Sequence, residues 1–187
     1  MNILVCIKQV PDTTEIKIDP VKHTLIREGV PSIVNPFDAC ALEMAVRLKE
    51  KEGGKVIVIS MGPAQAKNAL KECLAVGADQ AFLVTDRAFG GSDTLATSYI
   101  LSRAIAAVEA KTGEKFDLIF CGKQAIDGDT AQVGPEIAEH MDLPHVTLAT
   151  AVEMADGKLH VTRDTDEGHD LVEVSLPALV TVTKTTY

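Results

Sequence analysis

Four apolar stretches, each followed by a polar loop and an amphipathic segment, dominate the pattern of hydrophobic and polar positions up to residue 141. The apolar stretches predict strands at about residues 3–7, 55–60, 80–85 and 117–121. The amphipathic segments predict helices at about residues 37–52, 64–76, 93–111 and 131–141. Strands that alternate with helices in this way are typical of an α/β fold with a mostly parallel sheet.

Two regions depart from this pattern. Residues 15–28 alternate apolar and polar positions around Asp19 and Pro20, which predicts a small hairpin after the first strand. From His145 onward the helical periodicity stops, and short strands are predicted at about residues 146–153, 158–163, 171–174 and 179–183. These strands are expected either to extend the sheet with antiparallel strands or to dock on a partner.

The starts of two predicted helices have clear sequence signals. Asn35 followed by Pro36 predicts an N-cap with proline at the first helical position. Ser92 and Asp93 predict the start of the third helix in the same way.

The loop between the strand that ends near Cys121 and the last predicted helix is the most informative segment. Residues 118–121 are continuously apolar, as expected of a strand that is covered on both faces. The loop therefore follows the carboxyl end of a parallel strand, where open α/β sheets bind nucleotides. Gly128 and Gly134 are expected to let a ligand approach the backbone closely.

The residues of this loop allow two interpretations. Thr130, Gln132 and the N–H groups at the helix start are suited to hold a phosphate, helped by the positive end of the helix dipole. In the alternative, the loop is an ordinary connection in which Asp129 and Thr130 cap the helix. Three further loops, at residues 6–9, 34–38 and 60–63, are expected to converge at the same edge of the sheet.

Composition and charge exclude several classes of function for this chain. The 187 residues are 46% hydrophobic and 24% charged, which predicts a single globular domain over residues 1–187. A net charge of -9 argues against a nucleic-acid partner, and no segment is apolar enough for a membrane span. The four cysteines lack CxxC spacing and are interpreted as small buried residues, which favours a reducing, cytoplasmic location. The sequence contains neither a catalytic constellation nor the spacing of a metal site.

Several motifs, in order along the chain, match one known family. They are LVCIKQVPDT at residues 4–13, VNPFDACALEMAVRLKE at 34–50, VIVISMGPAQAKNALKECLAVGAD at 56–79, GKQAIDGDTAQVGPE at 122–136 and LPALVTVTK at 176–184. On these motifs the whole chain resembles the electron transfer flavoprotein beta subunit. The resemblance implies a Rossmann-like (adenine nucleotide alpha hydrolase-like) three-layer sandwich with a mostly parallel sheet and added antiparallel strands.

The resemblance also implies that the chain binds FAD or, alternatively, AMP. The contacts carried over from the family fall on Cys6, Asn35, Pro36, Phe37, Asp38, Met61, Gly122, Lys123, Gln124, Ala125, Ile126, Asp127, Gly128, Asp129, Thr130, Ala131, Gln132 and Val133.

Several of these residues also have a purely structural interpretation. Asn35 and Asp38 are equally suited to cap the helix that they begin. Cys6 is interpreted as a core residue whose backbone lines the pocket, and Met61 as a packing residue. As bare charges, the carboxylates next to Gly128 would repel a phosphate, so helix capping or acceptance of a ribose hydroxyl is expected of them.

Two loops, at residues 86–97 and 127–136, resemble the electron-bifurcating branch of the family. In this branch FAD occupies the place that AMP has in the simpler electron carriers. Asp93 and Thr94 are then expected near the flavin, with capping of the third helix as the alternative. The branch implies an alpha subunit as partner, NADH as electron donor, and ferredoxin or flavodoxin together with an acyl-CoA dehydrogenase as acceptors. The redox chemistry belongs to the bound flavin.

Family members continue beyond the strand near Lys184 into a recognition loop and a C-terminal arm, so the chain is expected to be a shortened form. The runner-up function is a free-standing adenine-nucleotide sensor that resembles the universal stress proteins. An ATP-pyrophosphate-cleaving ligase is a weaker alternative, because the Gly90-Gly91-Ser92-Asp93 segment follows the third predicted strand and not the first.

Overall fold

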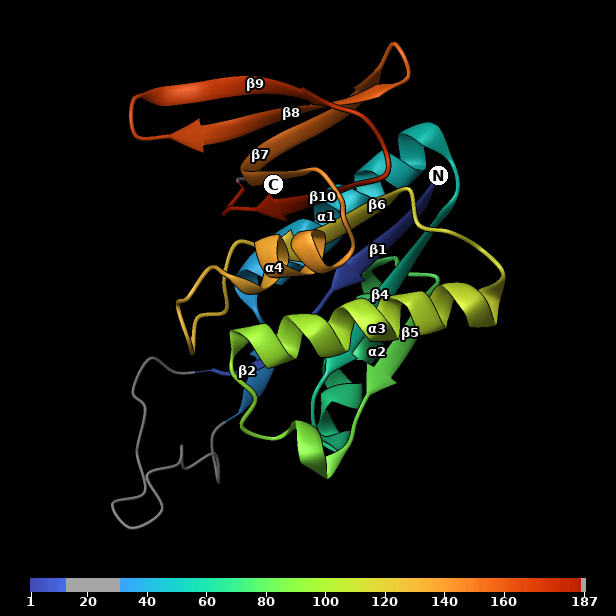
Figure 1. The fold of residues 1–187 in the computed structure, drawn as a ribbon, viewed down its shortest axis with the longest axis vertical. Coiled ribbons are helices and arrows are strands. Elements are labelled where there is room, and N and C mark those ends of the chain that lie inside the picture. Colours follow the sequence, from blue (N-terminus) through green and yellow to red (C-terminus); the bar gives the residue numbers. More distant parts are fainter. Residues whose placement is uncertain (13–30, 186–187) are drawn as a thin grey trace.

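The computed structural model describes residues 1–12 and 31–185, and the hairpin predicted at residues 15–28 lies outside them. Within the described residues, eight strands form one sheet in the order β5-β4-β1-β6-β10-β7-β8-β9 (Figure 1). The strands are β1 (Asn2–Cys6), β4 (Lys55–Met61), β5 (Gln80–Val84), β6 (Leu118–Gly122), β7 (His145–Ala155), β8 (Lys158–Thr165), β9 (Gly168–Val174) and β10 (Ala178–Val182). A separate antiparallel ribbon consists of β2 (Gln9–Pro11) and β3 (Ser32–Val34).

The sheet is parallel from β5 to β7 and antiparallel from β7 to β9. The predicted α/β class with a mostly parallel sheet is therefore confirmed. The strands expected after His145 do extend the sheet, but only β8 and β9 are antiparallel to their neighbours. β10 lies between β6 and β7 and is parallel to both.

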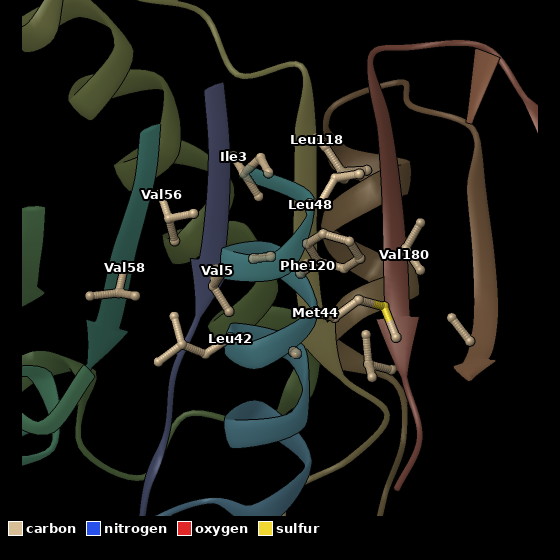
Figure 2. Packing of buried hydrophobic residues seen from close by; sticks show 14 of the residues in the cluster. Ile3, Val5, Leu42, Met44, Leu48, Val56, Val58, Leu118, Phe120 and Val180 are labelled. Atoms are coloured by element: carbon tan, nitrogen blue, oxygen red, sulfur yellow. The ribbon is translucent and has the colours of Figure 1, made fainter. Parts of the chain in front are cut away.

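Helices cover both faces of the parallel strands. They are α1 (Pro36–Glu52), α2 (Lys67–Val76), α3 (Thr94–Thr112) and α4 (Val133–His140). The core on one face contains residues of α1 and α2, and the core on the other face contains residues of α3 and α4. Figure 2 shows Leu42, Met44 and Leu48 of α1 packed over the central strands. None of the helices in the described part of the chain is long and apolar enough to cross a membrane.

The apolar run at the end of β6 is buried on both faces, as predicted. Leu118 and Phe120 belong to the core under α1, whereas Ile119 and Cys121 belong to the core under α3 and α4. Consecutive side chains of a strand point to opposite faces, so a strand between two helix layers needs apolar residues at every position. The last residues of β6 therefore lie at the carboxyl ends of the parallel strands, where the loop to α4 begins.

Two predicted helix starts were wrong by a few residues. α4 begins at Val133 and not at residue 131, because Asp129 and Ala131 have left-handed φ angles of 52° and 54°. Pro135 also has no N–H group to donate to the Ala131 carbonyl, so a helix starting at residue 131 would lack a hydrogen bond in its first turn. The segment predicted as one helix from residue 64 is divided into a 3-10 turn, η1 (Ala64–Ala66), and α2.

Candidate functional site

A cavity of about 760 Å³ lies at the carboxyl ends of β1 and β6. Cys6 at the end of β1 is in register with Cys121 of β6. The order of the sheet reverses between these two strands, since β4 and β5 follow on one side and β10 and β7 on the other. Open α/β sheets bind ligands at such a switch point, and cofactor sites have volumes of roughly 300–1,000 Å³. The position and the size of the cavity both fit a nucleotide site.

Most of the predicted cofactor residues line this cavity. They are Cys6, Asp38, Met61, Asp93, Thr94, Gly122, Lys123, Gln124, Ala125, Gly128, Asp129, Thr130, Ala131, Gln132 and Val133. The lining does not include Asn35, Pro36, Phe37, Ile126 and Asp127. Contact of any of these residues with a nucleotide stays a prediction.

Asn35 is the N-cap residue of α1 and Pro36 its first helical residue, as predicted, but the Asn35 side chain makes no capping hydrogen bond. Its Nδ2 group donates to the Gln124 carbonyl over 2.8 Å, and its Oδ1 accepts from the Ile126 N–H over 3.2 Å. Asn35 is fully buried, so its side chain fixes the β6–α4 loop to the start of α1. The sequence prediction of a side-chain cap was wrong because these partners lie 89 and 91 residues further along the chain.

Asp38 is a buried carboxylate that connects α1 to the ends of two strands. Its Oδ2 accepts from the backbone N–H of Lys8 over 2.7 Å, and its Oδ1 accepts from the N–H of Gly122 over 3.1 Å. The capping role considered for Asp38 was therefore also wrong. Burial raises the pKa of this carboxyl to about 7, although the hydrogen bonds from Asn35, Lys8 and Gly122 favour its charged form.

This raised pKa predicts that stability falls with rising pH. An ordinary aspartate in the unfolded chain loses its proton near pH 4, whereas folded Asp38 keeps it to about pH 7. The folded state therefore binds more protons between these two values, and the free energy of unfolding decreases across that window, by on the order of 4 kcal/mol. Urea unfolding at pH 5, 6, 7 and 8 measures this decrease. The Asp38→Asn variant is expected to lack this part of the pH dependence, and equal slopes in the two proteins would contradict the assignment.

The β6–α4 loop has an irregular backbone that differs from an ordinary capped helix start. Gln124 Nε2 donates to Asp129 Oδ1 over 2.7 Å, and Asp129 and Ala131 are both left-handed. The N-cap position of α4 is Gln132, whose side chain makes no capping hydrogen bond. Asp129 and Thr130 therefore do not cap α4, and that alternative was wrong. A helix N-terminus without a side-chain cap is suited to bind an anion.

Gly134 has a packing role in addition to its place in the cavity wall. A Cβ atom on Gly134 would lie 2.7 Å from the Thr181 methyl group of β10. Besides the ligand approach expected from the sequence, Gly134 therefore lets α4 lie directly on the sheet. Gly128 is different, since a Cβ atom there meets nothing within 4 Å.

The start of α3 forms another part of the cavity wall. The Asp93 carboxylate accepts from the Ala96 N–H over 2.8 Å, so its predicted capping role is confirmed. Thr94 Oγ1 donates to Glu136 Oε1 over 3.1 Å. This hydrogen bond links the first turns of α3 and α4, which places both helix starts at the same cavity.

Some lining residues were not among the predicted contacts. They include Lys8, Gln9, Phe89, Thr97 and Leu101. Thr94, Thr97 and Leu101 are spaced by three and four residues, which places them on one face of α3. That spacing is visible in the sequence, but only the fold identifies the face that borders the cavity.

Two thiols lie in contact in the cavity wall. The Cys121 thiol is hydrogen-bonded to Cys6, and this contact together with burial raises the pKa of Cys121 above its ordinary value. All four cysteines are free, as predicted, but Cys40 is only half-buried and not fully buried. A thiol with a raised pKa is largely protonated at neutral pH and is a poor nucleophile. Cys121 thus serves as a small residue of the cavity wall.

Comparison with known proteins identifies the family of the chain. Residues 22–187 match the family model of the electron transfer flavoprotein domain. The electron transfer flavoprotein subunit beta of Thermoanaerobacterium thermosaccharolyticum is 59% identical over 184 residues, which are 98% of this chain and 68% of the relative. The chain belongs to the electron transfer flavoprotein family. The beta-subunit resemblance stated from the sequence motifs is thereby confirmed.

Further relatives support the same membership. The electron transfer flavoprotein subunit beta of Clostridium acetobutylicum is 58% identical, with 98% of this chain and 69% of the relative covered. The caffeyl-CoA reductase-Etf complex subunit CarD of Acetobacterium woodii is 54% identical, with the same coverage. Electron transfer is the role that this family shares.

Proposed function

We propose that the chain binds FAD, with AMP as the alternative ligand, and relays electrons as the beta subunit of an electron transfer flavoprotein. The observation that carries the proposal is the cavity between β1 and β6, at the reversal of strand order, with the uncapped start of α4 at its wall. Its volume suits a cofactor, and the relatives carry the name of a flavoprotein subunit.

The lining residues have complementary roles in this proposal. The adenosine end of the ligand is assigned to the neighbourhood of Cys6 and Met61, and its phosphates to residues 130–133 at the start of α4. Asn35 acts indirectly, because it holds the loop that carries the phosphate groups. When a flavin is bound, it supplies the redox chemistry, and the chain supplies orientation and electrostatics.

The proposal extends to partners. An alpha subunit completes the complex, NADH donates electrons, and ferredoxin or flavodoxin together with an acyl-CoA dehydrogenase accept them in the bifurcating branch. The loop that contains Gly90, Gly91 and Asp93 supports this branch, since it borders the same cavity as the β6–α4 loop. A cytoplasmic location is part of the proposal and rests on the free thiols.

Reconstitution of the chain with its alpha subunit is expected to give two FAD molecules per heterodimer. The complex is denatured, and the released FAD and AMP are quantified by chromatography against the protein concentration. One FAD and one AMP would contradict the bifurcating branch but keep the nucleotide site. A colourless chain that releases AMP and forms no complex would favour the adenine-nucleotide sensor. Absence of any nucleotide from this subunit would contradict the proposed function as a whole.

A further inference from the structure

The charged side chains around the cavity are poorly matched to a phosphate. Its lining contains the carboxyl groups of Asp86, Asp93 and Asp129, besides the buried Asp38 carboxyl, which keeps its proton to about pH 7. Among the described lining residues, only the lysines at positions 8 and 123 carry a positive charge. A nucleotide phosphate brings further negative charge into this surrounding, so a nearby cation has a large influence on its affinity.

The two lysines differ in what holds their ammonium groups. Lys123 Nζ lies 5.4 Å from the centre of the Phe37 ring, in a cation–π contact. Lys8 Nζ donates to Asp127 Oδ1 over 2.7 Å, while its side chain stays 47% exposed. Asp127 takes one of the three N–H donors of the Lys8 ammonium group, and no other described residue takes the remaining two.

Lys8 is also fixed at its backbone. Its N–H donates to the buried Asp38 carboxylate over 2.7 Å, directly after β1 ends. Asp127 belongs to the β6–α4 loop, and its side chain is only 8% exposed. Asp38 of α1 thus positions the backbone of Lys8, and Asp127 of the loop that carries the proposed phosphate site positions its ammonium group. Such positioning lowers the entropic cost of a contact with a ligand.

We propose that Lys8 binds the phosphate of the nucleotide, with Asp127 as the positioning residue that holds its ammonium group at the cavity wall. The inference rests on the proposed nucleotide function and adds the cation that the family motifs did not assign. Asp127 then acts through Lys8, which explains why a carboxylate in a phosphate-binding loop lies outside the cavity lining. The ribose contact expected of Asp127 from the sequence is replaced by this role in the proposal.

The test compares ligands with and without a phosphate. Calorimetry with the full chain is expected to show that Lys8→Met weakens AMP or FAD binding about ten- to a hundredfold, while adenosine measured by competition binds within about twofold of wild type. If Lys8→Met weakens the affinity for both AMP and FAD, Lys8 is assigned to the adenosine-linked phosphate. If it weakens the affinity for FAD alone, Lys8 is assigned to the second phosphate. Lys8→Arg keeps the charge and is expected to retain AMP and FAD affinity within about threefold.

Two further variants distinguish a specific contact of Lys8 with the phosphate from a general effect of the net charge. Lys55 forms a comparable exposed ion pair with Glu114, over 2.8 Å, at the opposite end of β4. Lys55→Met is therefore the matched control and is expected to leave AMP affinity unchanged. Asp127→Asn keeps an oxygen that can accept from Lys8 and removes a negative charge, so AMP affinity is expected to stay equal or to rise by about threefold, with adenosine affinity unchanged.

Three results would overturn the inference about Lys8 while the nucleotide site stands. They are unchanged AMP and FAD affinity in Lys8→Met, an equal loss of adenosine affinity in that variant, and a parallel loss of AMP and adenosine affinity in Asp127→Asn. If the wild-type chain binds neither AMP nor FAD, the proposed function itself fails. Circular dichroism melting curves establish that each variant compared is folded.

Discussion

The Gly128→Val variant is expected to bind AMP and FAD about ten- to a hundredfold more weakly than wild type and to unfold at the same temperature. Gly128 lines the cavity just before residues 130–133, the segment that is assigned to the phosphates. A Cβ atom at Gly128 meets no protein atom within 4 Å, and the glycine does not have a left-handed φ angle. Valine is therefore tolerated by the fold but occupies space that the ligand needs, and such crowding costs about 1–3 kcal/mol.

Calorimetric titration and a melting curve measure the two parts of this expectation. The Gly128→Ala variant serves as a graded control, because it adds one methyl group at the same position, and its loss of affinity is expected to be smaller. Unchanged affinity in a folded Gly128→Val protein would count decisively against placing the phosphates at this loop. A large drop in melting temperature would instead show that Gly128 is needed for folding.

The fold class was predictable because its signals are local. The apolar run that ends at Cys121 is short, continuous and followed by a polar loop, which is the pattern of a buried parallel strand. The position of β10 between β6 and β7 was not predictable, since strand order depends on contacts between residues far apart in sequence. The start of α4 was not predictable either, because it depends on the left-handed φ angles of Asp129 and Ala131.

For the candidate site too, features with a local sequence signal were predictable and features that depend on distant contacts were not. Its loops were predictable from the carboxyl ends of strands and from family motifs, and Asp93 was correctly predicted as a cap from its local sequence. The roles of Asn35 and Asp38 were not, because both have the sequence signature of a cap and instead bind backbone groups of distant loops. The Lys8 to Asp127 ion pair spans 119 residues and has no local signal at all.

A second large effect is expected at Gly122, which connects the site to the stability of the fold. A Cβ atom there would lie 2.3 Å from Asp38 Oδ1, 2.7 Å from Phe37 Cβ and 2.8 Å from the Asp38 nitrogen. Two of these atoms belong to the rigid first turn of α1, so the helix has to move away from β6. The Gly122→Ala variant is therefore expected to lose about 3–5 kcal/mol of unfolding free energy, the sum of overpacking and of one weakened buried hydrogen bond.

Urea unfolding of Gly122→Ala and of Gly128→Ala tests this expectation. Both variants add one methyl group to a glycine of the same segment, so only the surroundings of the added group differ. Gly128→Ala is expected to stay within about 1 kcal/mol of wild type, because its added methyl group meets nothing. Equal stability of the two variants would contradict the close approach of α1 to β6. Since the Gly122 N–H donates to Asp38, displacement of α1 is also expected to expose that carboxyl and lower its pKa. Gly122→Ala should therefore lose part of the pH dependence of stability that Asp38 confers, which a purely local clash at Gly122 would leave unchanged.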